Sequence, residues 1–304
     1  MILCCGEALV EMQPLPAGDG PPRFAAHPGG TAVGCAVALG RLGVPVGFFG
    51  ALSTDRFGRL LAHALTEARV DLSRAPRSDR PTTLAFPDPG GGVDLRDGAT
   101  AGRTLQPGSL PDLSGVAALA FGGVHLAAEP CGSAFEALAT AARSRHVLLL
   151  DPNIRPALIA DADAYRARLD RMIALSDILK LSEADLAWLR GSGETDGQGE
   201  ALLALGPSLV IVTHGARGAT AHAAGRAPVF VPAPSVTVAD RLGAGETFTA
   251  GILAALHRAG ALDRASVAAL PTAALRRAVN LGVHAAAVTV SRRGPNPPYA
   301  GELS

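Results

Sequence analysis

The segment DRLGAGETF at residues 240–248 combines a run of small residues with a carboxylate at the expected start of a helix. Gly243, Ala244 and Gly245 would let a ligand approach the backbone closely, because they carry no bulky side chain. Free N–H groups at a helix start, together with the helix dipole, form a site for an anion. Glu246 follows on the first turn, where its carboxylate could accept a proton from an attacking hydroxyl. An anion site beside a base is what phosphoryl transfer to an alcohol requires.

Two further segments lie where ligands of open α/β sheets bind, beside the carboxyl ends of strands or the start of a helix. The sequence HPGG ends in Gly29 and Gly30 directly before an expected helix, so a polar ligand could approach that backbone. The sequence DPNIRP at 151–156 follows an apolar strand, and its two prolines stiffen the loop. Asn153 and Arg155 therefore leave the end of that strand as polar groups.

A fourth segment, VTHGARG at 212–218, runs from an expected strand into a turn punctuated by glycine. Thr213, Gly215 and Gly218 would suit a turn that passes beneath a nucleotide. Each of the four segments also has a purely structural interpretation, as a Gly-rich helix start, a capped turn or a plain hairpin. The functional interpretation therefore depends on their occurring together.

The composition excludes several classes of protein. With 48% hydrophobic and 18% charged residues among 304, the chain is not intrinsically disordered. The 27 basic residues, of which only Lys180 is a lysine, balance the 27 acidic ones, so no net charge attracts nucleic acid or an anionic membrane. The chain has no G-x-x-x-x-G-K-S/T loop, no GxGxxG after its first strand and no HExxH motif. P-loop enzymes, dinucleotide dehydrogenases and zinc enzymes are therefore not expected.

The cysteines at positions 4, 5, 35 and 131 form no CxxC pair and indicate buried free thiols in a reducing cytoplasm. The N-terminal sequence MILCCGEALV lacks a basic region, so it predicts no signal peptide. No uninterrupted apolar stretch of about 18 residues predicts a membrane span. We therefore expect a cytoplasmic protein without a membrane partner.

Apolar runs and amphipathic stretches alternate along the chain, which favours an α/β fold with a parallel sheet covered by helices. Runs typical of strands lie at 1–5, 44–50, 116–121, 147–150, 178–181 and 209–213. Helical spacing occurs at 30–42, 57–68, 133–142, 162–175, 183–190, 245–258 and 273–289.

Residues 76–106 interrupt this alternation. Residues 82–86 predict a strand, PDPGGG at 87–92 a turn and residues 93–95 a return strand, so the hairpin should project as a flap. A short strand is expected at 23–25.

Two polar or turn-rich regions complete the pattern. Residues 218–223 and 228–231 predict a local antiparallel pair, and GSGETDGQG at 191–199 predicts a polar surface loop.

Taken together, the segments resemble the PfkB/ribokinase family of carbohydrate kinases, and within it the bacterial fructokinases. HPGGTAVGCAVALGRLGVPVGFFGALSTDRFGRLL and DRLGAGETFTAG resemble the family's two signatures, with PTTLAF, DPNIRPALI, LKLSEADLAWL and VTHGARGA between them in the expected order. The resemblance implies one ribokinase-like domain over 1–304, with a mostly parallel central sheet flanked by helices. It also implies a small β-sheet lid from about 8–27 and 80–104, lid-mediated homodimers, and ATP with Mg²⁺ as cofactors.

The resemblance also assigns roles to individual residues. Glu246 would be the catalytic base, and the anion hole would be Gly243, Ala244 and Gly245. The sugar would contact Glu11, Gly29, Gly30, Asn153 and Arg155. The nucleotide would contact Ser182, Asp185, Thr213, Gly215 and Gly218, and a monovalent cation could bind near Asp240.

The chain departs from the family pattern at five positions. Glu246 and Glu11 replace aspartates, Gly34 replaces an asparagine, Arg241 replaces a small hydroxyl residue, and Gly102 replaces an acidic lid residue. We predict that the pocket has adapted to the longer base, with Gly34 and Gly102 making room. The alternative is a site that has decayed.

The predicted function is an ATP-dependent sugar kinase that phosphorylates a primary hydroxyl of a fructose-like sugar. One alternative is a 2-keto-3-deoxygluconate-type sugar-acid kinase, in which Arg96, Arg103 or Arg155 would pair with the substrate carboxylate. Another is a catalytically silent relative that binds sugar or nucleotide.

Overall fold

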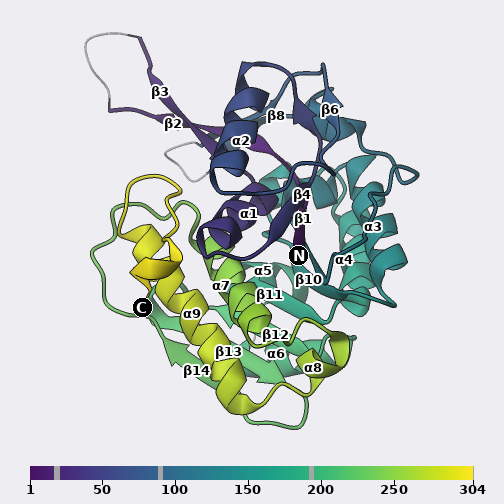
Figure 1. Ribbon diagram of the computed structural model, residues 1–304, viewed down its shortest axis with the longest axis vertical. Helices are drawn as coiled ribbons and strands as arrows, with labels where there is room; N and C mark the ends of the chain where they lie inside the picture. Colours follow the sequence, from purple (N-terminus) through teal and green to yellow (C-terminus); the bar gives the residue numbers. More distant parts are fainter. Residues whose placement is uncertain (17–20, 88–91, 192–194, 304) are drawn as a thin grey trace.

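The computed structural model describes residues 1–16, 21–87, 92–191 and 195–303. Its main feature is an eight-stranded sheet in the order β14-β13-β12-β11-β10-β9-β1-β4 (Figure 1). From β4 to β12 the neighbouring strands are parallel, whereas β13 and β14 are antiparallel. The parallel strands are β1 (Ile2–Gly6), β4 (Val46–Phe49), β9 (Ala118–Gly122), β10 (Val147–Asp151), β11 (Ile178–Ser182) and β12 (Leu209–Thr213). The antiparallel strands are β13 (Gly218–Ala223) and β14 (Val229–Pro232).

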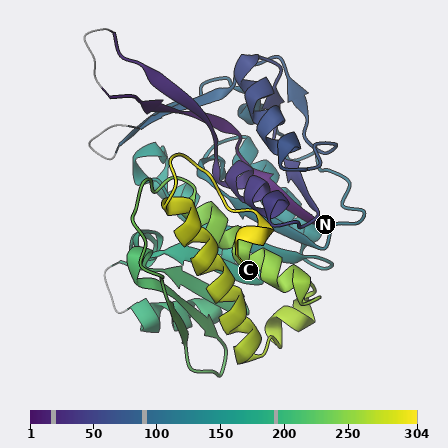
Figure 2. The same ribbon diagram turned by 60° about the vertical axis from the view of Figure 1, so that its left-hand side comes forward.

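A second, four-stranded sheet, here called the small sheet, has the order β3-β2-β7-β8. Its strands are β2 (Leu9–Pro14), β3 (Phe24–Gly29), β7 (Thr83–Pro87) and β8 (Val93–Arg96). Strands β2 and β3 extend away from the α/β body in both Figure 1 and Figure 2. The short strands β5 (Leu52–Ser53) and β6 (Arg77–Ser78) form a separate pair.

Helices cover both faces of the main sheet, and each face has its own hydrophobic core. The first core includes residues of α1 (Thr31–Arg41), α2 (Arg56–Glu67), α7 (Ala244–Arg258), α8 (Arg264–Ala268) and α9 (Thr272–Val290). The second includes residues of α3 (Cys131–Ala142), α4 (Ala162–Leu175), α5 (Glu183–Arg190) and α6 (Thr195–Leu203). Short 3₁₀ helices are η1 (Ala101–Thr104), η2 (Val124–Ala127), η3 (Pro156–Leu158), η4 (Gly215–Arg217) and η5 (Ala300–Glu302).

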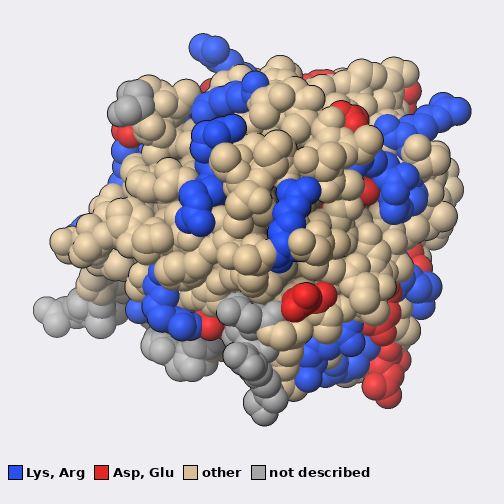
Figure 3. Space-filling model, turned by 90° about the horizontal axis from the view of Figure 1, so that it is seen from below, with Lys and Arg blue, Asp and Glu red and all other residues tan. Residues whose placement is uncertain are grey.

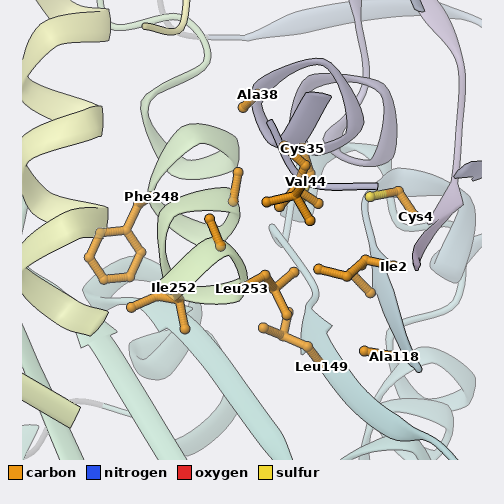
Figure 4. Close-up of a cluster of buried hydrophobic side chains, with 14 of the residues drawn as sticks. Ile2, Cys4, Cys35, Ala38, Val44, Ala118, Leu149, Phe248, Ile252 and Leu253 are labelled. Carbon is orange, nitrogen blue, oxygen red and sulfur yellow. The ribbon is translucent and has the colours of Figure 1, made fainter. Parts of the chain in front are cut away.

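Successive residues of a strand point to opposite faces, so β1 contributes to both cores. Ile2 and Cys4 belong to the first core, and Leu3 and Cys5 to the second. Figure 4 shows Leu253 of α7 beside Ile2 of β1 in the first core. Because both faces are buried, the parallel strands are continuous apolar runs in the sequence.

The predicted alternation of strands and helices is confirmed, including the antiparallel pair β13–β14. The interrupting hairpin is confirmed as β7 and β8, which lie in the small sheet rather than in the main sheet. The residues of its turn at 88–91 lie outside the described residues. The strand expected at 23–25 is the longer β3, which pairs with β2 through backbone hydrogen bonds that composition does not reveal.

The predicted surface loop at 191–199 is wrong in its second half, because α6 begins at Thr195; residues 192–194 lie outside the described residues. Leu202 of α6 is fully buried in the second core. Gly199 lies against the His222 ring, so a β-carbon there would be 2.6 Å from Nε2. Tertiary packing thus stabilises a helix in a sequence of low helical propensity.

The surface carries both signs of charge, in line with the zero net charge of the chain. Figure 3 shows one face on which Lys and Arg side chains are scattered over neutral surface, with acidic side chains beside several of them. Within the described ranges, no helix is both long and apolar enough to cross a membrane.

Candidate active site

Glu246 lies half-buried on the first turn of α7. The Asn153 side-chain amide donates to Glu246 Oε1 over 3.3 Å and to Thr31 Oγ1 over 2.9 Å. Asn153 adopts a left-handed φ of 47°, which asparagine tolerates better than most residues. Its amide therefore links the start of α1, the loop after β10 and the start of α7 around the predicted base.

The start of α7 is open to a ligand. Gly243 occupies the N-cap position with a left-handed φ of 78°, and no side chain accepts a hydrogen bond from the first turn there. Ala244 and Gly245 are half-buried and present only small side chains. The predicted anion site therefore has accessible backbone N–H groups at the positive end of a 15-residue helix.

Glycines lie against both of the unusual glutamates. A β-carbon on Gly34 would be 2.9 Å from Glu246 Cγ, and one on Gly29 would be 2.8 Å from Glu11 Cγ. Real β-carbons essentially never make such short contacts. Gly34 thus makes room for the Glu246 side chain, as predicted.

The corresponding prediction for Gly102 is wrong. A β-carbon on Gly102 would clash with the ring of His125, not with Glu246. Gly102 lies in η1 and is buried, where its missing side chain admits the His125 imidazole. Its role is therefore packing between η1 and η2.

Glu11 lies on strand β2 of the small sheet, and it is close enough to Glu246 for the two charges to interact. Burial raises the pKa of Glu11 to about 7, and the negative charge of Glu246 adds to this shift. The Gln13 amide, which donates to Glu11 over 3.4 Å, and the charge of Arg155 act in the opposite direction. The charges of Glu246, Asp240 and Arg155 therefore all act on the Glu11 carboxyl group.

Glu7 supports the glycine pair before α1. Gly30, the N-cap of that helix, has a φ of 101° and cannot provide a side-chain cap. Glu7 Oε1 accepts the Thr31 backbone N–H over 2.8 Å instead. Sequence reasoning missed this buried glutamate, although it directly follows the first strand.

Lys180, the one lysine in the chain, lies buried beneath the start of α7. Its Nζ is 3.1 Å from Asp151, whose other partner is the Thr249 hydroxyl at 2.8 Å. Burial by itself would lower the pKa of Lys180, but the carboxylates of Asp151, Asp185 and Glu246 together raise it. A β-carbon on Gly245 would be 3.3 Å from Nζ, so the ammonium group lies next to the predicted anion site. Sequence reasoning missed this buried cation.

Ser182 and Asp185 form a capping box at the start of α5. Asp185 Oδ2 accepts from the Ser182 backbone N–H at 2.8 Å and from its hydroxyl at 2.6 Å. Asp185 Oδ1 accepts the Ile154 N–H at 2.7 Å, which braces the loop carrying Asn153. These two predicted nucleotide ligands do not line the pocket described next.

A pocket of about 560 Å³ adjoins the start of α7 on the side of β12. Ligand pockets typically have this size. The predicted residues Thr213, Gly215 and Gly218 line it together with Ala244 and Gly245. Sequence reasoning missed its apolar wall, because tertiary folding brings this wall together; it includes Val236, Val238, Phe248, Val283, Ala287 and Val290.

The described residues contain no group of three or more His, Cys, Asp or Glu side chains that could hold a metal ion. Asp240 accepts the Leu242 N–H over 3.0 Å and the Gly294 N–H over 2.9 Å, so it braces the loop before α7. Mg²⁺ in kinase sites is held largely by substrate phosphates and water. The site therefore fits a magnesium ion that arrives with the phosphates of a nucleotide.

Comparison with known proteins identifies the family of the chain. The model of the pfkB family carbohydrate kinases matches residues 1–300. The chain is 42% identical to a fructokinase of Rhizobium leguminosarum bv. trifolii over 280 residues, covering 91% of this chain and 86% of that protein.

Solved structures show the same fold. A fructokinase of Xylella fastidiosa with bound ATP superposes with a TM-score of 0.90 at 25% identity, over 99% of this chain and 96% of that one. A Vibrio cholerae fructokinase variant bound to fructose, ADP and a potassium ion gives a TM-score of 0.84 at 25% identity, over 97% and 93% of the two chains. The fold is thus that of the ribokinase-like sugar kinases, and the chain belongs to the pfkB family of carbohydrate kinases.

Proposed function

We propose that this protein is an ATP-dependent kinase that transfers the γ-phosphoryl group to a primary hydroxyl of a fructose-like sugar. One observation carries the proposal: the Glu246 carboxylate and the open N–H groups of Ala244 and Gly245 lie on the same turn of α7, next to a pocket of nucleotide size. A base and an anion site are thus adjacent, as in-line phosphoryl transfer requires.

In this mechanism the sugar lies between the small sheet and α7, against Glu11, Gly29, Gly30, Asn153 and Arg155. Its hydroxyl oxygen forms a bond to the γ-phosphorus as the bond to the β-phosphate oxygen breaks, which yields ADP. Glu246 accepts the hydroxyl proton, while Asn153 holds its carboxylate over 3.3 Å. The backbone N–H groups at the start of α7 stabilise the negative charge on the transferred group.

The nucleotide base lies against the apolar wall of α9 and the 233–238 loop, and the phosphates extend toward Ala244 and Gly245. Thr213, Gly215 and Gly218 also line this pocket. Mg²⁺ bound to the phosphates would neutralise part of their charge. Ser182 and Asp185 act on this site indirectly, because their hydrogen bonds to each other and to Ile154 fix the neighbouring loop.

The charges around the sugar space favour a neutral substrate over a sugar acid. Glu11 and Glu246 are both carboxylates that would repel a substrate carboxylate. Arg103 donates to Asp97 over 2.6 Å, and Arg96 pairs with Asp94 over 2.5 Å at an exposed position. Arg96 and Arg103 are thus paired with aspartates, whereas the charge of Arg155 acts on Glu11.

Four broader features belong to the same proposal. The small sheet acts as a lid on the sugar, because its strand β2 carries Glu11. Two chains pair through the small sheet. A monovalent cation binds near Asp240. The protein functions in the cytoplasm, since its four cysteines are free and buried, as in a reducing compartment.

An assay of ADP release over a panel of sugars and sugar acids tests the activity. We expect fructose to give the highest kcat/KM and 2-keto-3-deoxygluconate to give at most a tenth of it. Higher turnover on the sugar acid would favour the first alternative. Turnover on none, with sugar or ATP still bound in calorimetry, would favour the catalytically silent relative.

A further inference from the structure

The wall of the nucleotide pocket contains one charged residue among those that the structure describes, Arg241. The other lining side chains are apolar, small or hydroxyl-bearing. A polyphosphate carries several negative charges, whereas the start of a helix offers only about half a positive charge. The position of Arg241 in this wall therefore matters for any ligand that carries phosphate.

Arg241 is held in place by its neighbours in the chain. It lies two residues before the N-cap Gly243, and the carboxylate of Asp240 bonds the backbone N–H groups of Leu242 and Gly294. These bonds fix the loop on which Arg241 stands. Its side chain is exposed and forms no ion pair with any carboxylate in the described ranges, so the guanidinium is free to bind a ligand.

We propose that Arg241 binds the polyphosphate chain of the nucleotide and makes this pocket select phosphorylated nucleotides over nucleosides. The inference rests on the proposed function and names a residue that the family pattern does not supply, since a small hydroxyl residue is usual there. A guanidinium donates two parallel hydrogen bonds to phosphate oxygens, which a serine or threonine hydroxyl cannot do.

Titration calorimetry with ATP, ADP and adenosine tests this inference on the full chain. In Arg241→Ser, we expect the Kd of ATP and ADP to rise about tenfold or more, because a charge-assisted hydrogen bond is lost. The Kd of adenosine should change less than about twofold. The ATP Kd of Arg241→Lys should lie between those of the wild type and Arg241→Ser. An ammonium group keeps the positive charge but cannot donate two parallel hydrogen bonds.

Arg217→Ser is the matched control, because it removes one positive charge close to the pocket but not from its wall. Arg217 is 69% exposed and pairs with Glu183. We expect its ATP Kd to stay within about threefold of the wild type. Unchanged ATP affinity in Arg241→Ser, or an equal loss for ATP and adenosine, would overturn the inference. If the wild type binds neither ligand, the nucleotide pocket of the proposed function is itself wrong.

Discussion

At the scale of single residues, the site contains two glutamates where the family pattern has aspartates, and a glycine lies against each. Gly34 accommodates the side chain of Glu246, and Gly29 that of Glu11. The extra methylene group of each glutamate thus occupies space that an ordinary side chain would fill. Because Gly34 itself departs from the family pattern, its contact with Glu246 favours an adapted site over a decayed one.

We expect Glu246→Gln to lower kcat about 100-fold or more, in the range typical for loss of a general base. Glu246→Asp should lower kcat by less, because a shorter carboxylate remains but moves away from Asn153. Steady-state rates on the best sugar measure both effects. An unchanged rate in the Gln variant would mean that another group is the base, and a faster Asp variant would indicate a decayed site.

Gly34→Ala should lower kcat about tenfold or more with little loss of stability, because the new methyl group must displace the Glu246 side chain. Gly197→Ala is the control, since Gly197 is also helical but has open space around it. We measure kcat and the melting temperature of both variants to separate an effect on the Glu246 position from an effect on stability. If Gly34→Ala keeps the wild-type kcat, the contact with Glu246 does not position the base.

Glu11→Gln should weaken sugar binding and yet stabilise the free protein at pH 8. The raised pKa of about 7 means that the folded chain keeps a proton that the unfolded chain, with an ordinary pKa of about 4.3, has lost. Stability therefore falls as pH rises from about 4.3 to 7, and the variant should gain on the order of 1 kcal/mol at pH 8.

Urea unfolding of wild type and Glu11→Gln at pH 5 and pH 8 tests this, with sugar KM measured in parallel. At pH 5 the variant should show only about a third of the gain seen at pH 8, because most of the pH window lies above pH 5. A variant that is less stable than the wild type at pH 8 would contradict the raised pKa.

At the scale of elements, Asp97 connects the small sheet to the main body. It directly follows β8 and accepts hydrogen bonds from the Thr83 and Thr100 hydroxyls and from Arg103 Nε, at 3.0, 2.9 and 2.6 Å. Its Oδ1 is also 3.1 Å from the buried His125 ring of η2. Despite burial, these partners lower the pKa of Asp97 to about 2.

Asp97→Asn should destabilise the protein by roughly 2 kcal/mol at pH 7. Because the folded pKa is lowered, the carboxylate contributes this stability fully above about pH 4 and loses it as pH falls toward 2. The difference in unfolding free energy between wild type and variant should shrink over that window. Asp94→Asn, at an exposed pair of the same sheet, should change stability by less than about 0.5 kcal/mol.

At the scale of the whole molecule, the small sheet exposes apolar side chains that would be covered in a dimer. Phe24 is 42% exposed and packs edge-to-face on Phe86, with ring centroids 5.5 Å apart. Leu15, just beyond β2, is 43% exposed. Isolated apolar residues at a surface are common, but a cluster at a sheet that projects from the body favours self-association.

We expect light scattering after size exclusion to give the mass of a dimer for the wild type and of a monomer for Phe24→Asp. A charge at the centre of an apolar contact costs several kcal/mol when it is buried without a partner. Phe230→Asp serves as control, since Phe230 is 47% exposed on β14, outside the small sheet. A monomeric wild type at micromolar concentration would contradict pairing through the small sheet.

The order of strands and helices could be predicted from the sequence alone, because apolar periodicity and turn residues are local properties of the chain. The four segments around Gly29, Asn153, Thr213 and Glu246 could be assigned to one site for a related reason. Each lies at the end of a parallel strand or the start of a helix, and parallel topology brings those ends to one edge.

Contacts between residues far apart in the chain were decided only by the tertiary structure. Gly34 contacts Glu246, Lys180 lies close to Gly245, and Gly102 accommodates His125 rather than Glu246. The apolar wall of the pocket beside α7 is formed by residues of α9 and of the 233–238 loop. These contacts depend on which faces of distant elements pack within a few ångströms of each other. The local periodicity of the sequence does not specify that packing.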